Sequence, residues 1–333
     1  MNGNTIVNNV VLASNPGTSW QPFNGSLPSP VVQVSAARGD LDLNGDGKAD
    51  VLFRNDDGRV AEWQMNGNTI VSSVVLSSNP GTAWKVAGTG DFNGDGRSDI
   101  LWQHDDGRVA EWQMNGNTIV NNVVLGSNPG TGWKVAGVGD FNGDGKSDVL
   151  WRHDDGRVAQ WQMNGTSIVS DALINSTPNT SWKVAGVGDF NGDGKADILW
   201  RNSTTGQVAE WQMNGNTIVN NVVLGSNPGT SWNVAGVGDF NGDGRSDVLW
   251  GHVDGRVAEW QMNGTAITSD AVLGNPGTVW QVADIGDYNG DGRSDILWHN
   301  SSTGAAAEWQ MNGNTIVNNV VLSESPSLDW HLV

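Results

Sequence analysis

The sequence predicts an all-β protein, a β-propeller built from four-stranded antiparallel blades. A nine-residue acidic segment recurs six times, with starts 48 to 50 residues apart. Between these segments lie short runs rich in β-branched residues, separated by turns rich in Gly, Asn and Pro, and no stretch has a helical period. Four strands in a repeat of this length are typical of a propeller blade. Parallel β-helices have shorter coils and helical solenoids need helices, so both fit poorly.

One unit, residues 84–132, illustrates the predicted order of the elements. A short first strand of small residues begins at Trp84 and runs into the acidic segment, and Asp99–Trp102 form the second strand. Residues 108–114 form the third strand, which ends at Asn-Gly, a strong hairpin signal. Residues 118–125 form a β-branched fourth strand. The Asn-Pro-Gly-Thr link after it suits the return from the outer edge of a blade to the central channel.

The repeat counts bear on how the ring closes. The acidic segment occurs six times and Met-Asn-Gly seven times, so six complete units are flanked by partial ones. We expect a single propeller over 1–333, with a partial repeat and irregular insert at 1–30, six complete repeats at 31–322, and a partial repeat or closing strand at 323–333. The irregular stretch lies between Trp20 and Asp42 and serves as a linker or a rim. We favour six blades closed by an end strand, and the alternative is a seventh blade assembled from both termini.

The start of the chain bears on its cellular location. Met1–Leu12 is identical to Met114–Leu125 and lacks the basic start and apolar middle of a secretory signal. We therefore expect a fragment of a longer secreted, extracellular protein. No apolar run reaches 18 residues and no cysteine is present, so the sequence predicts neither membrane insertion nor disulfides.

The chain is strongly acidic, with a formal net charge of −19, which argues against nucleic acid or an anionic membrane as partner. Eighteen of the 36 acidic residues lie in the six repeated segments, at three Asp in each. Six divalent cations would bring the net charge from −19 to −7, an ordinary value for a soluble protein.

The acidic segments have the composition of calcium loops, and we expect about six Ca²⁺ ions. Positions 1, 3, 5 and 9 offer side-chain oxygens, position 7 offers a backbone carbonyl, and Gly at position 6 permits a sharp turn. The predicted side-chain ligands are Asp42, Asn44, Asp46 and Asp50; Asp91, Asn93, Asp95 and Asp99; Asp140, Asn142, Asp144 and Asp148; Asp189, Asn191, Asp193 and Asp197; Asp239, Asn241, Asp243 and Asp247; and Asp287, Asn289, Asp291 and Asp295. The predicted carbonyl ligands are those of Lys48, Arg97, Lys146, Lys195, Arg245 and Arg293.

Three other interpretations of these segments fit less well. An EF-hand needs Glu at position 12, where Trp102 stands, and flanking helices. A plain turn that binds nothing needs no four carboxylate or amide groups. Magnesium prefers a stricter octahedron with retained water.

The string Val-Gly-Asp-Phe-Asn-Gly-Asp-Gly-Lys-Ser-Asp-Val-Leu-Trp at 138–151 resembles the FG-GAP-like (VCBS) repeat family. That family includes the calcium-binding blades of integrin α-chain propellers, and related propellers include lectins. The resemblance covers about residues 35–322 and implies that the loops join the first and second strands of each blade and brace it with calcium. The Phe-Gly and Gly-Ala-Pro signatures of the integrin version are missing, so the resemblance does not extend to integrin partners.

The 18 Trp fall into three registers. Seven follow links of the Asn-Pro-Gly-Thr type, five end the second strand and six lie in the third strand. Packing between blades is the simplest role, since propeller sheets are covered on both faces. The sharper hypothesis is that one register stacks on sugar rings, and the candidates we assign to ligand binding are Trp102, Trp151, Trp200, Trp250 and Trp298. The sequence does not decide which register is exposed.

The remaining polar registers do not predict an enzyme. Four of the five His lie beside the second-strand turn, and Glu recurs five times in the third strand, with Gln160 in its place once. A catalytic carboxylate is rarely duplicated in this way, and no nucleophile elbow, phosphate loop or zinc motif is present. The resemblance would also permit a polysaccharide lyase, which typically needs a Tyr or His as catalytic base. The only Tyr of this chain lies within an acidic loop.

We therefore expect no enzyme but a calcium-stabilised extracellular binding module, lectin-like toward glycans or adhesive toward a surface protein. The alternative is a structural repeat segment or a designed consensus scaffold without its own ligand. The sequence is silent on oligomeric state.

Overall fold

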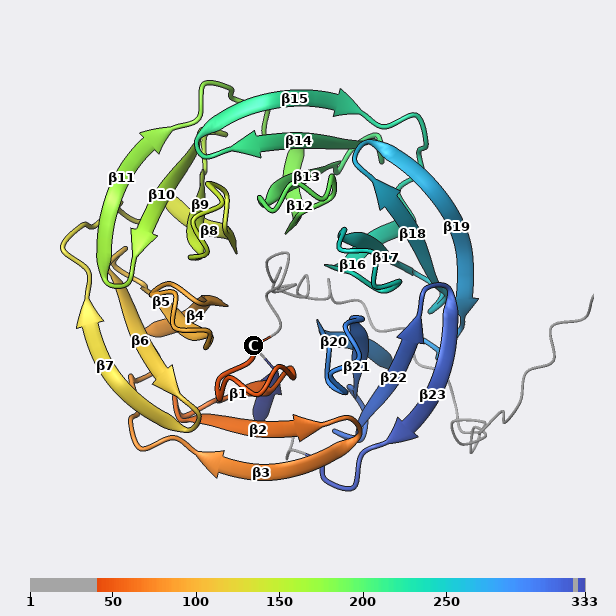
Figure 1. Cartoon of the computed structure of the whole chain (residues 1–333), viewed down its shortest axis with the longest axis horizontal. Coiled ribbons are helices and arrows are strands. Elements are labelled where there is room, and N and C mark those ends of the chain that lie inside the picture. The colour runs from red at the N-terminus through yellow and green to blue at the C-terminus, as the bar shows by residue number, and fades with distance from the viewer. Residues whose placement is uncertain (1–40, 326–328, 333) are drawn as a thin grey trace, which may run out of the picture. The chain divides into compact units, whose positions relative to one another are not determined.

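The computed structural model describes residues 41–325 and 329–332, and over these residues it is a six-bladed propeller (Figure 1). Twenty-four strands form six four-stranded antiparallel sheets, which confirms the predicted fold class. The partial repeat predicted at 1–30 and most of the irregular stretch after Trp20 lie outside the described residues. The described residues contain no helix with the length and hydropathy of a membrane span.

The blades are numbered in chain order, and each is given from its innermost to its outermost strand. Blade one consists of β24 (Trp330–Leu332), β1 (Val51–Asn55), β2 (Val60–Asn66) and β3 (Thr69–Val75). Blade two consists of β4 (Trp84–Gly90), β5 (Asp99–His104), β6 (Val109–Asn115) and β7 (Thr118–Val124). Blade three consists of β8 (Trp133–Gly139), β9 (Asp148–His153), β10 (Val158–Asn164) and β11 (Ser167–Leu173). Blade four consists of β12 (Trp182–Gly188), β13 (Asp197–Asn202), β14 (Val208–Asn214) and β15 (Thr217–Val223). Blade five consists of β16 (Trp232–Gly238), β17 (Asp247–His252), β18 (Val257–Asn263) and β19 (Ala266–Gly274). Blade six consists of β20 (Trp280–Gly286), β21 (Asp295–Asn300), β22 (Ala306–Asn312) and β23 (Thr315–Val321).

The burial of each strand follows from its place in the blade. The first four residues of β5 are buried on both faces, because blades one and three enclose the middle of this sheet. In the outermost strand β7 only Ile119 and Val123 are half-buried and the other five residues are exposed, as expected for an edge strand with one face in water. Its exposed positions carry Val120 and Val124, at 57% and 49% exposure. The outer strands therefore present a repeated apolar surface at the circumference of the ring (Figure 1).

Adjacent blades are held together by one hydrophobic core at each interface. Trp102 and Trp112 of blade two pack on Leu52 and Leu76 of blade one. The clusters repeat around the ring, and the last one joins residues of blade one to residues of blade six. The inner strands approach closely: a Cβ added to Gly137 would lie 2.4 Å from Cγ2 of Val187 in the next blade. Glycine is needed here because of this close packing and not because of its backbone conformation, since its φ is not positive.

The ring closes through the C-terminal strand. β24 pairs antiparallel with β1, with Leu332 opposite Phe53 and Trp330 opposite Asn55. The amide Nδ2 of Asn55 also donates to Oδ2 of Asp329 at 3.0 Å. Strands from both ends of the described chain thus share blade one. This arrangement is the predicted closure of six blades by an end strand, and the described residues form no seventh blade.

Candidate metal sites

In blades two to six the acidic loop connects the innermost strand to the second, as residues 91–99 connect β4 to β5, and in blade one the loop at residues 42–50 leads into β1. The loop folds around the side chain of its first residue. Oδ1 of Asp91 accepts N–H groups of Gly94 and Asp95 at 2.6 and 3.2 Å, and Oδ2 accepts that of Gly96 at 2.8 Å. Gly94 and Gly96 have φ of 80° and 82°, a conformation that favours glycine. The Asn-Gly-Asp-Gly sequence is therefore what allows three N–H groups to converge on one carboxylate.

The ninth residue of each loop is a fully buried aspartate that ties the loop to the third strand. The ladder between β6 and β7 is irregular at Gln113/Met114, and the N–H of Met114 donates to Oδ1 of Asp99 at 2.9 Å. The equivalent bonds occur in all six blades at 2.8–3.2 Å. Burial raises the pKa of this aspartate to about 8 in five blades and to about 7 at Asp148, against the opposing effect of the Met N–H bond. Its negative charge is thus disfavoured unless a positive group joins it.

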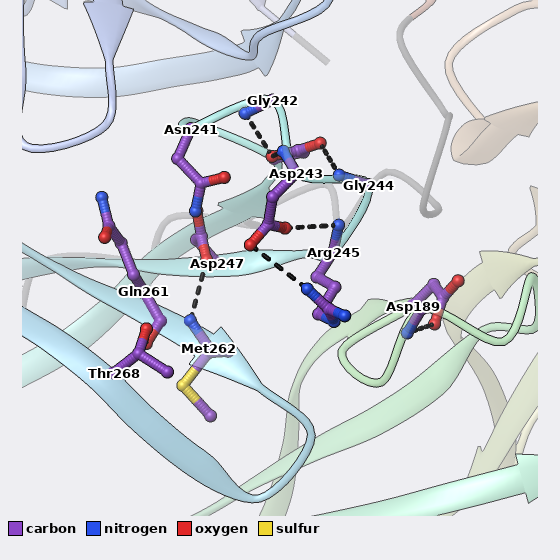
Figure 2. A network of polar contacts seen from close by, with 12 residues as sticks. Asp189, Asn241, Gly242, Asp243, Gly244, Arg245, Asp247, Gln261, Met262 and Thr268 are labelled. Atoms are coloured by element: carbon purple, nitrogen blue, oxygen red, sulfur yellow. Dashed lines mark hydrogen bonds and ion pairs between the residues drawn. The ribbon is translucent and has the colours of Figure 1, made fainter.

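Figure 2 shows the remaining groups in the loop of blade five. Oδ1 of Asp243 accepts the N–H of Arg245 at 3.0 Å, and Oδ2 forms an ion pair with the same residue at 3.4 Å. Nδ2 of Asn241 donates to Oδ2 of Asp247 at 3.1 Å. In blade three, the buried Oδ1 of Asn142 has no hydrogen-bond donor among the described residues. The side chains predicted as ligands therefore lie around each loop, together with the carbonyl-bearing residue at position 7.

The predicted carboxylates share a loop but do not converge. Among residues 41–325 and 329–332, no group of three or more His, Cys, Asp or Glu side chains is placed to hold a metal ion. In blade five, backbone N–H groups instead engage the carboxylate of Asp239. The carboxylate of Asp243 is engaged by the backbone and side chain of Arg245 (Figure 2). The donor set still fits a hard divalent cation: it is all oxygen, it includes the unpartnered amide oxygen of Asn142, and it includes a buried carboxylate whose charge is uncompensated.

The acidic loops also join neighbouring blades. The N–H of Ser98 in blade two donates to the carbonyl of Asp42 in blade one at 2.7 Å. The hairpin residue Gly116 of blade two donates to the carbonyl of Leu43, also at 2.7 Å. The same two bonds occur at every interface, including the one between blades six and one. The six loops therefore form a continuous hydrogen-bonded ring, and a change in one loop acts directly on the next.

The tryptophans assigned to ligand binding are buried. Trp102, Trp151, Trp200, Trp250 and Trp298 are only 1–2% exposed and lie inside the interfaces between blades. A sugar ring would reach them only after two blades separated. The half-buried tryptophans are those that begin the inner strands, at the strand ends opposite the acidic loops: Trp84, Trp133, Trp182, Trp232, Trp280 and Trp330.

Polar side chains surround several of these half-buried tryptophans. The ring of His104 lies 4.8 Å from that of Trp84, and the guanidinium of Arg108 lies 5.5 Å from the indole centroid. Oδ1 of Asp106 lies 2.7 Å from Nδ1 of His104, and Oδ2 forms an ion pair with Arg108. Blades three and five repeat this cluster. Sequence reasoning treated these His as residues of solvated turns; the signal it missed is that His and Trp occupy paired positions on neighbouring strands.

Comparison with known proteins identifies the repeat. The model of the FG-GAP-like repeat matches five overlapping pairs of units: residues 42–102, 91–151, 140–200, 189–250 and 239–298. The chain belongs to the FG-GAP-like repeat family. FG-GAP-like repeats often bind calcium, and in this member a buried aspartate recurs in every blade. No curated protein matches the sequence.

Two solved structures show the same fold at low sequence identity. A chain of the nidogen/laminin complex aligns with a TM-score of 0.55 at 12% identity, over 85% of this FG-GAP-like chain and 96% of that one. A chain of the Tc holotoxin pore of Photorhabdus luminescens aligns with a TM-score of 0.54 at 20% identity, over 80% of this chain and 13% of the toxin chain. The FG-GAP-like chain thus spans a small part of the toxin chain, and both similarities concern the fold.

Proposed function

We propose that this FG-GAP-like propeller is a calcium-stabilised extracellular binding module, and that its ligand is a glycan. The four side-chain oxygens of each loop, together with the carbonyl at position 7, would hold the ion. Bound calcium supplies two positive charges where three aspartates share nine residues, as in Asp91–Asp99. In this proposal the metal stabilises the scaffold, and recognition takes place elsewhere on the blades.

The observation that carries the glycan proposal is the ring of six half-buried tryptophans at the strand ends opposite the acidic loops. An indole offers a flat apolar face to the C–H groups of a sugar, while nearby His, Asp and Arg side chains offer hydrogen bonds to its hydroxyls. In blade two these groups are His104, Asp106 and Arg108 beside Trp84. Because the site recurs in several blades, weak individual contacts would combine into useful avidity on a glycan surface.

A surface protein is the second candidate ligand, favoured by the exposed valines of the outer strands. Val120, Val219 and Val317 occupy equivalent positions and are 56–57% exposed. The similar chain in the nidogen/laminin structure comes from a complex between proteins. Neither candidate requires catalysis, and we propose no enzymatic activity, because the Trp-His-Arg clusters recur in three blades instead of forming one unique constellation.

A glycan array with calcium and with a chelator tests the proposal. We expect calcium-dependent binding that falls in a Trp133→Ala, Trp232→Ala double variant and persists in a Val120→Ala, Val219→Ala control. Binding lost in the control and kept in the tryptophan variant would favour the circumference and a protein ligand. A chain that binds calcium but no glycan under any condition would support the alternative of a structural repeat segment.

A further inference from the structure

The third strand of each blade carries one deeply buried polar side chain that the loop chemistry above does not use. In five blades it is a glutamate, 0–1% exposed, and in blade three it is Gln160, 1% exposed. The five glutamates are Glu62, Glu111, Glu210, Glu259 and Glu308. Each has at least one carboxylate oxygen with no hydrogen-bond donor among the described residues. In three blades the other oxygen accepts a hydrogen bond from a glutamine, as Oε1 of Glu111 does from Nε2 of Gln113 at 3.1 Å. A buried carboxylate oxygen without a donor is costly, so a repeated one points to a missing positive group.

This side chain lies on the same face of the sheet as the buried aspartate at the ninth position of the acidic loop. Glu111 on β6 is paired with Leu101 on β5, two residues along the strand from Asp99 and on the same face. In blade three, Nε2 of Gln160 reaches Oδ2 of Asp148 at 3.4 Å. A side chain at this position therefore extends to the oxygen that faces the loop.

We propose that the third-strand glutamate supplies an additional negative charge to the cation site of its blade. The six sites then form two classes: five tighter sites with glutamate, and one weaker site in blade three with Gln160. This inference rests on the proposed binding of calcium by the acidic loops. It concerns a residue outside the nine-residue loop, which the loop sequence alone does not include.

The chemistry of the two side chains gives the direction of the difference. A glutamate carboxylate attracts a divalent cation across a short distance in a buried site of low dielectric constant, where charge interactions are much stronger than in water. A glutamine amide has no net charge, and in blade three it also donates a hydrogen bond to the oxygen of Asp148. Loss of one nearby charge at such a site is expected to weaken binding by about tenfold or more.

The test is a calcium titration of the full chain after removal of metal, followed by calorimetry for affinity and by native mass spectrometry for stoichiometry. The parent chain should show five tighter sites and one weaker site. The Gln160→Glu variant should make all six sites equivalent, and Glu111→Gln should give four tighter and two weaker sites. Glu324→Gln removes a charge from an exposed position and serves as the matched control. Melting curves of each metal-free variant separate binding effects from unfolding.

The outcomes distinguish this inference from the proposal it rests on. Six equivalent sites in the parent chain, unchanged by Gln160→Glu and Glu111→Gln, would overturn the role of the glutamate and leave calcium binding intact. If neither the parent chain nor any variant binds calcium, both the role of the glutamate and the proposed calcium binding are overturned. A two-class pattern that also changes in Glu324→Gln would attribute the effect to overall charge and overturn the specific placement.

Discussion

The carbonyl of Asp287 accepts a hydrogen bond of 2.8 Å from the N–H of Ala49, which joins the last acidic loop to the first. This bond makes the chain of loop contacts circular, because every other loop is already linked to its neighbour in sequence. The loops are thus a shared structural element of the ring as well as separate candidate sites. The backbone of each loop is therefore hydrogen-bonded to both adjacent blades.

The first prediction concerns metal removal. Chelation should lower the thermal unfolding midpoint, because a ligand that binds only the folded state stabilises it by about 2.7 kcal/mol per site at a hundred times its dissociation constant. Differential scanning calorimetry with calcium, with chelator, and with magnesium as the ion control measures the effect. An unchanged midpoint would exclude structural calcium.

The second prediction concerns ring closure. Deletion of residues 329–333 removes β24 and uncovers Phe53 and its neighbours on β1. Loss of the half-buried Trp330 and Leu332 should cost about 2–5 kcal/mol of unfolding free energy. The control is His331→Ala, because the contact of His331 with Asp56 is largely exposed and worth little. Urea unfolding distinguishes the two, and equal stability of both variants would mean that β24 does not close the ring.

The third prediction concerns the contact of inner strands across a blade interface. Gly137→Ala places a Cβ 2.4 Å from Cγ2 of Val187 and should destabilise the protein by about 1–3 kcal/mol. Val187→Ala in the same chain removes the clashing atom, so the double variant should recover part of the loss relative to the sum of the single changes. Gly126→Ala, where no atom lies within 4 Å, is the matched control and should be nearly neutral. Additive effects in the double-mutant cycle would contradict the contact.

The fourth prediction concerns pH. Asp284 occupies a position held by glycine in blades two to five, and burial raises its pKa to about 6. Because the folded state holds this proton more tightly than the unfolded state, Asp284 favours folding at pH 4, and this contribution is lost as pH rises toward 6. Asp284→Asn should therefore reduce the fall in stability over this range by about 1–3 kcal/mol.

The matched variant for this prediction is Tyr288→Phe, which introduces the phenylalanine found at this position in blades two to five. The hydroxyl of Tyr288 donates to Oδ2 of Asp284 at 3.0 Å and so favours the charged carboxylate. Its removal should raise the pKa of Asp284 further, so that the loss of stability occurs at higher pH. Urea unfolding at several pH values measures both variants, and identical pH profiles for all three chains would refute the assignment.

Much of the fold could be predicted from the sequence, because the repeat exposes its own periodicity. The Asn-Gly turn after residue 114 and the β-branched run at 118–125 define a hairpin locally, and the structure has β6 and β7 there. The choice of six blades over seven could not be made locally, since it depends on the pairing of β24 with β1, separated by most of the chain.

The candidate sites were less predictable, because they depend on contacts between strands. The loop residues could be chosen from their oxygens, but not the bond from Met114 to Asp99, which arises from an irregularity in the β6–β7 ladder. All three registers consist of tryptophans, so residue type does not distinguish them. Only the stacking of blades determines that Trp102 is buried while Trp84 is half-buried. The burial of Glu111 likewise follows from the next blade covering its face of the sheet.

The pairing of β24 with β1 also determines how the ring responds to mechanical load. Leu332, the last described residue of β24, lies opposite Phe53 in β1, and pairing continues from there toward Trp330 and Asn55. The C-terminal end of β24 and the N-terminal end of β1 lie at the same end of the pair, so tension applied between these two ends would peel the pair apart residue by residue instead of shearing all its hydrogen bonds together. The seam in blade one is where a pulled ring would begin to open, before any interface between uninterrupted blades gives way.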